Sequence, residues 1–274
     1  MTTGTANMDI VITDLVFTYP SGVTALNGVT LSIPAGQRLA IVGQNGAGKT
    51  TLVRHLNGIF QPTQGTVEIG DWTTTGRDIA ALAARVGYVF QNPDEQLFAR
   101  NIRDEIAFGP RNLGVPKDEI PDRITAALKR SGLEGKEDTH PYHLSLSERK
   151  RVALASVLAM ETPIVVLDEP TTGQDARGVA LIGKVVGELS AEGRTVVAIT
   201  HDMDFCAENF ERVLVMADGQ VLADGDPDHA FTQLDALAEA HVEPPQLERL
   251  RSALGWKDPV ATVDEFVAQL TKKR

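Results

Sequence analysis

The fold of this chain is decided by one short run, Gly43-Gln44-Asn45-Gly46-Ala47-Gly48-Lys49-Thr50. The run has the spacing G-x-x-x-x-G-K-[ST]; it follows a short apolar segment, 39–42, and precedes a segment of helical character, 50–57. A strand, a glycine-rich loop and a helix in this order aim main-chain N–H groups at one anion, and the helix adds its positive amino end. The stretch therefore predicts a phosphate-binding loop in an α/β protein.

The end of this loop carries side chains with the chemistry that a nucleotide requires. Lys49 would reach the terminal phosphates, and the hydroxyl of Thr50 would bind Mg²⁺. We expect the loop to contact a nucleotide, with ATP and Mg²⁺ as ligands, through the residues Gly43, Gln44, Asn45, Gly46, Ala47, Gly48, Lys49, Thr50 and Thr51.

A second apolar run, 164–167, ends in the two carboxylates Asp168 and Glu169. The carboxyl end of a buried parallel strand is where α/β sheets bind their ligands. Asp168 would hold Mg²⁺ directly or through a water molecule, and Glu169 could polarise a water molecule for attack. Two acids after a strand could also be a solvated loop, but the phosphate loop elsewhere in the chain favours the functional interpretation.

Composition limits the kind of protein that carries these motifs. The chain has 274 residues, 42% of them hydrophobic, and a formal net charge of −11, values of an ordinary globular protein. The acidic balance argues against nucleic acid as a partner and against adsorption on anionic lipid. The lone cysteine, Cys206, cannot close an internal disulfide, and no apolar run approaches the ~20 residues of a membrane span. Any role at a membrane would depend on a partner protein.

The pattern along the chain indicates a composite architecture. Strand-like alternation dominates residues 9–33, and helical stretches at 102–108, 118–131 and 148–160 are broken by Pro110, Pro116, Pro121 and Pro141. Strand and helix alternate again over 164–216, which implies parallel strands between helices. After Gly225 the chain turns mostly helical and polar. We interpret the middle region as a helical subdomain inserted into an α/β body.

The motifs together resemble those of the ATP-binding-cassette (ABC) ATPases, over nearly all of residues 9–225. The resemblance implies that Tyr19 stacks on adenine and that Gln91 senses Mg²⁺ and contacts a transmembrane partner. It implies that Asp168 is the metal carboxylate and Glu169 the catalytic glutamate, and that His201 lies near the γ-phosphate. The catalytic set it implies is Glu169, His201, Lys49 and Gln91, and the metal set is Thr50, Gln91 and Asp168.

The same resemblance implies a fold. We expect an α/β P-loop cassette over residues 9–225, with an antiparallel β subdomain and a helical subdomain inserted at about 92–160. Residues 226–274 would form a short C-terminal helical extension, whose apolar stripe at Leu247, Leu250 and Leu254 fits either its own domain or, slightly better, a dimer contact.

One segment departs from the family pattern. Leu144-Ser145-Leu146-Ser147-Glu148 occupies the position of the usual LSGGQ signature, so Ser145 is kept and the two glycines are lost. The resemblance implies that Ser145, Leu146, Ser147 and Glu148, with Asp175 of the D-loop, face the ATP of the opposite subunit. Ser145 and Glu148 also form a capping box, and Asp175 could simply cap the helix after it. Our hypothesis is that this chain donates a weakened signature to its partner.

Finer features are similar to the ATPase subunits of energy-coupling-factor importers, which take up vitamins, cobalt or nickel. They lie in the stretches 91–98, 106–114 and 170–178. The resemblance implies hydrolysis of ATP to ADP and phosphate at the cytoplasmic face of a membrane. It also implies a second ABC ATPase subunit, a transmembrane coupling subunit and a substrate-binding membrane protein as partners, and no nucleic acid.

Two other functions stay open at this point. One is a subunit that binds ATP in a heterodimer without strong turnover, which the altered signature favours. The other is a non-transport ABC ATPase, which the acidic charge and the short interval between Lys49 and Asp168 disfavour, since that interval holds only the helical subdomain. The cargo, and the choice between homodimer and heterodimer, are left open by the sequence.

Overall fold

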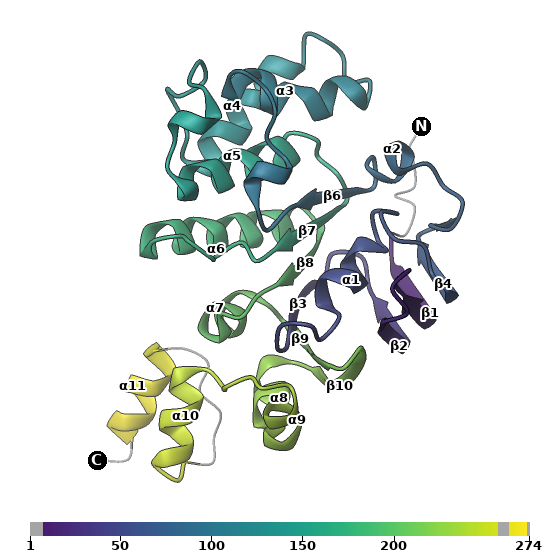
Figure 1. The fold of residues 1–274 in the computed structure, drawn as a ribbon. Helices are drawn as coiled ribbons and strands as arrows, with labels where there is room; N and C mark the ends of the chain where they lie inside the picture. Colours follow the sequence, from purple (N-terminus) through teal and green to yellow (C-terminus); the bar gives the residue numbers. More distant parts are fainter. Residues whose placement is uncertain (1–7, 257–262, 273–274) are drawn as a thin grey trace, which may run out of the picture.

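The computed structural model describes residues 8–256 and 263–272, and it is built on two β-sheets (Figure 1). The larger sheet has the order β10-β9-β3-β8-β7-β6, and all its pairings are parallel except that of β9 with β10. Its strands are β3 (Arg38–Val42), β6 (Val86–Val89), β7 (Ile164–Asp168), β8 (Thr195–Ile199), β9 (Arg212–Ala217) and β10 (Gln220–Gly225). The buried strands β6, β7 and β8 are continuous apolar runs because both faces of the sheet are covered.

The two faces of this sheet pack against different partners. In β7, Ile164 and Val166 point to a core shared with α1 (Lys49–Arg54) and the smaller sheet. Val165 and Leu167 point to the opposite core, which is filled mainly by helices. The smaller sheet is antiparallel, with the order β2-β1-β4-β5. Its strands are β1 (Ile10–Thr18), β2 (Thr24–Ile33), β4 (Gln64–Ile69) and β5 (Trp72–Thr73).

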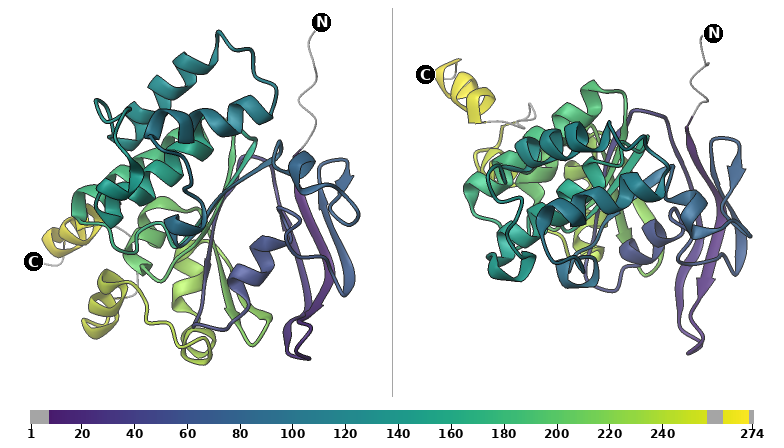
Figure 2. Two further views of the ribbon diagram at one scale, coloured as in Figure 1. Left: turned by 45° about the horizontal axis from the view of Figure 1, so that its top comes forward. Right: turned by 90° about the horizontal axis from the view of Figure 1, so that it is seen from above.

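The helical insertion gathers on the side of the larger sheet away from the smaller one (Figure 2). It holds α3 (Ile102–Asn112), α4 (Ile120–Ser131) and α5 (Leu146–Leu158) with the short helices η1 (Pro93–Glu95) and η2 (Pro141–His143), whereas α2 (Ile79–Leu82) precedes β6 and lies outside the insertion. The predicted break at Pro110 is wrong, since α3 runs on to Asn112. A proline in the last turn removes a single helical hydrogen bond, and burial of its ring adds apolar packing.

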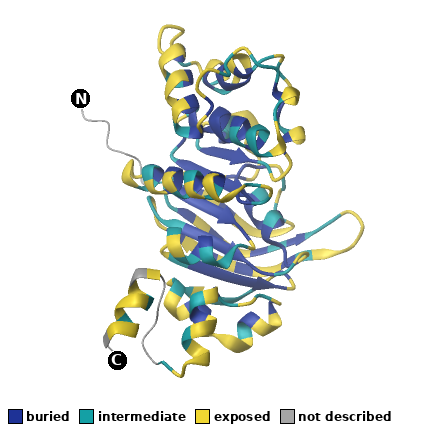
Figure 3. Cartoon of the chain, turned by 90° about the vertical axis from the view of Figure 1, so that its left-hand side faces the viewer, coloured by how far each residue is buried: buried dark blue, intermediate teal, exposed yellow. Residues whose placement is uncertain are grey.

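The remaining helices frame the carboxyl-terminal half. They are α6 (Ala176–Ala191), α7 (Met203–Asn209), α8 (Pro227–Thr232), α9 (Leu234–Glu239), α10 (Gln246–Ala253) and α11 (Val263–Lys272). Figure 3 contrasts the buried strands of the larger sheet with the largely exposed final helices. Leu250 and Leu254 of the predicted apolar stripe lie on the surface. Among the described residues no helix combines the length and the apolar character needed to cross a bilayer. The predicted α/β body with an antiparallel β subdomain and an inserted helical subdomain is confirmed, whereas the exact domain boundaries stay predictions.

Candidate active site

The phosphate loop joins β3 to α1, and its glycines allow an unusually close approach of main chains. Gly43 has φ +147°, and a Cβ there would lie 2.1 Å from the carbonyl oxygen of Met216. Gly48 has φ +97°, and a Cβ there would lie 2.6 Å from the carbonyl oxygen of Ala25. A side chain at either position would force the loop away from the strands that support it.

Lys49 lies beneath this loop and is buried. Its Nζ donates hydrogen bonds to the carbonyl oxygens of Gly43, at 2.6 Å, and Gln44, at 2.9 Å. Burial lowers the pKa of the ammonium group, and attraction to Glu169 and Asp168 opposes that effect. The lysine is therefore held in place by the loop's own backbone, with its positive charge at the loop where a phosphate would bind.

Asp168 ends β7 beside the first turn of α1. Its Oδ1 accepts a long hydrogen bond of 3.5 Å from the hydroxyl of Thr50, and its Oδ2 accepts one of 2.8 Å from the hydroxyl of Tyr88. Burial raises the pKa of this carboxyl group, and the bond from Tyr88 works against the rise. Tyr88 was not anticipated from the sequence; a tyrosine within an otherwise apolar buried strand was the available signal.

The pair formed by Thr50 and Asp168 fits Mg²⁺, which prefers oxygen ligands and keeps water and phosphate in its shell. A hydroxyl and a carboxylate oxygen 3.5 Å apart can both turn toward one such ion. No cluster of three or more His, Cys, Asp or Glu side chains suited to a metal occurs in the described part of the chain. A cation here would thus take its other ligands from nucleotide and water rather than from a closed protein cage.

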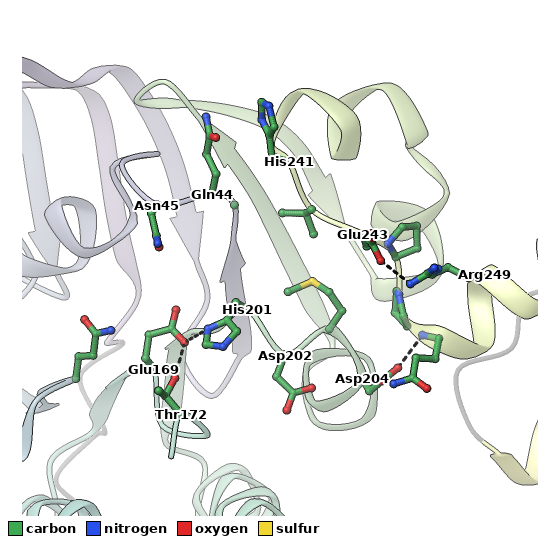
Figure 4. Close-up of a pocket in the computed structure, with 17 residues that line it drawn as sticks. Gln44, Asn45, Glu169, Thr172, His201, Asp202, Asp204, His241, Glu243 and Arg249 are labelled. Carbon is green, nitrogen blue, oxygen red and sulfur yellow. Dashed lines mark hydrogen bonds and ion pairs between the residues drawn. The ribbon is translucent and has the colours of Figure 1, made fainter. Parts of the chain in front are cut away.

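Glu169 follows directly and has φ +51°, a left-handed conformation that is uncommon outside glycine. Its Oε2 lies 2.6 Å from Nδ1 of His201, which donates when it is protonated, and 3.4 Å from the donating hydroxyl of Thr172. Figure 4 shows the carboxylate of Glu169 and the ring of His201 facing each other below Asn45 of the phosphate loop. Strain of this kind costs about 1–3 kcal/mol and is typical of functional sites.

Asn45, Glu169, Thr172 and His201 line a hollow of about 680 Å³, whereas Lys49, Thr50 and Asp168 lie outside its lining. Gln91, which follows β6, is exposed and lines the same hollow. The wall of the hollow that faces the phosphate loop is formed by residues 241–246 and Arg249 of the C-terminal extension. Figure 4 shows these residues across from Gln44. The extension is anchored there, because the N–H of Gln44 donates to the carbonyl oxygen of Ala240 at 2.9 Å. Sequence reasoning did not place the extension at this site.

Tyr19 lies beside the loop rather than within the hollow's lining. Its hydroxyl is 2.8 Å from the hydroxyl of Thr51 in α1. Its ring packs edge-on against Phe17 and Phe60, with centroids 4.9 and 5.6 Å away. These contacts fix the orientation of the ring next to the helix that follows the phosphate loop.

The altered signature begins α5 in a regular way. The Ser145 side chain caps the helix and forms the predicted capping box with Glu148. Lys136 also donates to Glu148, and these bonds lower the pKa of Glu148 to about 2. Leu146 and Ser147 are the first residues of the helix. Their side chains therefore cause no backbone strain there, unlike a side chain at a position that needs positive φ.

A reciprocal pair of hydrogen bonds joins Ser147 to Gln174. The hydroxyl of Ser147 donates to Oε1 of Gln174 at 2.7 Å, and Nε2 of Gln174 donates to the carbonyl oxygen of Ser147 at 3.2 Å. The next residue, Asp175, caps α6 by accepting from the N–H of Gly178 at 2.8 Å. Ser145, Ser147, Glu148 and Asp175 line a hollow of about 400 Å³ that is distinct from the one at the phosphate loop. The two predicted groups of site residues are thus kept apart within one chain.

Comparison with known proteins agrees with this arrangement. The family described as "ABC transporter" matches residues 26–172. A protein named energy-coupling factor transporter ATP-binding protein EcfA, from Methanothermobacter thermautotrophicus, is 42% identical over 95% of this chain and 86% of its own length. One of the same name from Methanocaldococcus jannaschii is 40% identical over 90% of this chain and 89% of its own length.

Solved structures are similar over much of the chain. The cbiO1 protein of Clostridium perfringens, described as part of the ABC transporter complex cbiONQ, is 35% identical, with a TM-score of 0.76 over 91% of this chain and 99% of that one. The ATP-binding cassette MJ0796, solved as a dimer in a post-hydrolysis state with ADP and Pi, is 27% identical, with a TM-score of 0.73 over 79% of this chain and 98% of that one.

Proposed function

Because this chain belongs to the ABC transporter family and is an ATPase of that family, we propose that it powers an energy-coupling-factor type importer. In this proposal it hydrolyses ATP at the cytoplasmic face of a membrane and drives uptake of a vitamin or a transition-metal ion, such as cobalt or nickel, through a membrane coupling protein. The observation that carries the proposal is the convergence of Lys49, Thr50, Asp168, Glu169 and His201 at one edge of the larger sheet.

Each of these groups has a distinct part in the proposed reaction. The main-chain N–H groups of the loop and the Lys49 ammonium bind the phosphates of ATP and stabilise the charge that develops during transfer. Thr50 and Asp168 would hold Mg²⁺, which neutralises charge on the phosphate oxygens when it is bound. Glu169 orients a water molecule in line with the γ-phosphorus, and its Oε1, to which neither His201 nor Thr172 donates, takes the proton.

A second subunit completes the site in this proposal. Within one chain the start of α5 lines a different hollow from the phosphate loop, so it is available to the nucleotide of another chain. A helix start capped by Ser145 offers N–H groups to an anion, as expected for the γ-phosphate of the partner's ATP. Head-to-tail closure of two cassettes on two ATP molecules would follow, and Gln91 at the rim would sense that closure.

A groove of about 360 Å³ offers a place for the membrane coupling subunit. Phe98 and Phe108 stand on its rim with 62% and 47% of their surfaces exposed, and their ring centroids are 4.7 Å apart. The buried carboxylate of Glu105 accepts hydrogen bonds from the N–H groups of Phe98, at 2.9 Å, and Ala99, at 2.7 Å. The loop that presents Phe98 is therefore held rigid, as needed to receive an apolar helix face.

The loop before Phe98 is also tied to α5. Gln96 accepts a hydrogen bond from the N–H of Phe90 at 3.1 Å and donates to the carbonyl oxygen of Ala153 at 2.9 Å. Arg149 of α5 forms an ion pair of 2.6 Å with Asp94. Motion of α5 on ATP binding would thus be passed to the groove, which supports a coupling role over a non-transport one.

Assays of ATP hydrolysis and of co-purification test the proposal. Purified chain should hydrolyse Mg²⁺-ATP, and lack of measurable affinity for Mg²⁺-nucleotide would overturn it. Phe98→Asp should abolish co-purification with the membrane coupling subunit, because a charge replaces the exposed ring in the groove. Val23→Asp is the matched control, since Val23 is exposed to 61% in the turn between β1 and β2. Uptake by vesicles holding the reconstituted complex would then identify the cargo.

A second candidate function differs in the partner. In a heterodimer whose other chain has an intact signature, this chain would keep a competent phosphate loop and donate a weak signature. The side chains of Leu146 and Ser147, in place of glycines at the start of α5, favour this candidate. Native mass measurement of the complex purified from cells distinguishes it from a homodimer.

A further inference from the structure

Lys150 is a buried cation that none of the roles above uses. It lies on α5, one turn after the altered signature, and only 8% of its surface is exposed. Its Nζ donates a hydrogen bond of 2.9 Å to the main-chain carbonyl oxygen of Glu169. Burial lowers the pKa of this ammonium group, and attraction to Glu169 and Asp168 opposes the shift. A buried charge is costly unless it is paired or hydrogen-bonded, and the carbonyl oxygen of Glu169 accepts such a bond here.

The residue that accepts this bond, Glu169, is the member of the acidic pair Asp168–Glu169 that has an uncommon backbone conformation. Glu169 has φ +51°, and its N–H donates to the carbonyl oxygen of Ile199 in β8 at 2.9 Å. The bond from Lys150 holds its carbonyl side. Both sides of the Glu169 backbone are thus fixed from different elements, and these anchors set the position from which its carboxylate reaches His201 and Thr172.

The same helix contacts the acidic loop a second time. Ser147 and Gln174 exchange two hydrogen bonds, and Lys150 donates to Glu169. The start of α5 is therefore bonded to both ends of the segment 169–174. The start of α5 and the carbonyl of Glu169 are therefore parts of one hydrogen-bonded unit. A displacement of the helix start would be transmitted to the backbone of Glu169 through Lys150.

We propose that Lys150 is a positioning residue for Glu169, which ties the start of α5 to the direction of the Glu169 carboxylate. The inference rests on the proposed role of Glu169 in water attack. When the helix start binds the ATP held by the partner subunit, Lys150 transmits the displacement of the helix to Glu169 in the chain's own site. The two ATP sites of a dimer would then be coupled within each chain.

The first test replaces Lys150 with Met, which has a similar length and fills the same buried space without charge. We expect Lys150→Met to lower kcat for ATP about 10-fold while KM and nucleotide affinity change less than about 2-fold, because orientation of Glu169 and not ATP binding is lost. Lys150→Arg should recover most of kcat. An unchanged kcat in Lys150→Met would overturn the inference. A rise in KM as large as the fall in kcat would also overturn it.

A matched control comes from α4, where it contacts the carboxyl end of α5. Arg123 also donates to a main-chain carbonyl oxygen, that of Ala159 at 3.4 Å, and pairs with Glu161 at 3.0 Å. Arg123→Met removes a comparable cation from the helical subdomain without touching Glu169, so kcat should stay within 2-fold of the native value. If Lys150→Met does not fold, Lys150→Gln replaces it, with the same expected fall in kcat.

The second test asks whether Lys150 acts through Glu169. In a Glu169→Gln background, single-turnover hydrolysis should be the same with and without Lys150→Met. A further loss in that background would mean a general structural role and would overturn the inference. If Glu169→Gln itself left turnover near normal, the proposed function of Glu169 would fail instead, so the two failures can be told apart.

Discussion

The phosphate-loop edge and the start of α5 are the two regions for which we propose contact with phosphate, and they are built by different means. At the loop, glycines let main chains approach to distances that no side chain permits, and Lys49 is held by backbone carbonyls. At the start of α5, the order comes from side chains: Ser145 and Glu148 cap the helix, and Ser147 binds Gln174. The first region therefore excludes a side chain at Gly43 and Gly48, whereas the second forms with side chains at each of its positions.

The largest effect should come from Glu169→Gln, at the loop edge. The variant keeps the size of the side chain but cannot take a proton from water, so we expect ATP turnover to fall at least about 100-fold while ATP still binds. Glu161→Gln is the control, because Glu161 is another non-glycine residue at positive φ, +55°, and its carboxylate pairs with Arg123 instead. Steady-state phosphate release measures both variants, and near-normal turnover in Glu169→Gln would contradict the assignment.

A smaller effect is expected at Tyr19, beside the loop. Loss of a stacking ring costs about 0.5–1.5 kcal/mol, so Tyr19→Leu should raise KM for ATP about 3- to 10-fold with little change in kcat. Tyr19→Phe keeps the ring and loses only the contact with the Thr51 hydroxyl. Equal effects of the two variants would place the role in the hydroxyl group rather than the ring.

At the start of α5, restoring two glycines tests whether the altered signature is weak. The double change Leu146→Gly and Ser147→Gly removes side chains from the surface that would meet the partner's phosphate, and we expect ATP turnover to rise about 3-fold. Gln174→Leu serves as control, since it breaks the bond with Ser147 but leaves both side chains in place. Turnover that stays level or falls in the double variant would count against the hypothesis.

The smallest expected effect is the pH-dependent contribution of Glu148 to the stability of the fold. Its pKa of about 2 lies below the ordinary value of 4.5, chiefly because Lys136 donates to its carboxylate. A lowered carboxyl pKa stabilises the fold above pH 4.5, and this contribution is lost as the pH falls from 4.5 toward 2.

Glu148→Gln should therefore reduce the free energy of unfolding by less than about 1 kcal/mol at neutral pH. The difference from the native chain should shrink at about pH 3.5. Urea unfolding at both pH values measures it, and a difference that grows in acid would contradict the ion pair with Lys136.

The same contrast explains what could be predicted from the sequence. The loop at 43–50 and the acids at the end of β7 depend on backbone geometry set by local residue order, so their neighbours in sequence predict them. Tyr88 and Lys150 act across long stretches of chain, on Asp168 and on the carbonyl of Glu169. A tyrosine in an apolar strand signals a polar contact, but no residue near Tyr88 or Lys150 in sequence identifies its partner. The break wrongly predicted at Pro110 has a similar origin, because packing of the buried ring outweighs local helix propensity.

The signature segment lies between these cases. Its capping box was predicted from Ser145 and Glu148 and is confirmed, since a cap involves residues close in sequence. The partner of Ser147 was not predicted, because Gln174 follows β7 in the sequence whereas Ser147 precedes it. The contact made by this departure from the family pattern is therefore visible only in three dimensions.

The hydrogen bond from the N–H of Gln44 to the carbonyl oxygen of Ala240 makes the tail of the chain a structural support for its front. A shortened chain ending before Ala240 would leave that amide with water as its partner. For this chain, trimming to a minimal cassette would remove one wall of the hollow at the phosphate loop together with the final helices.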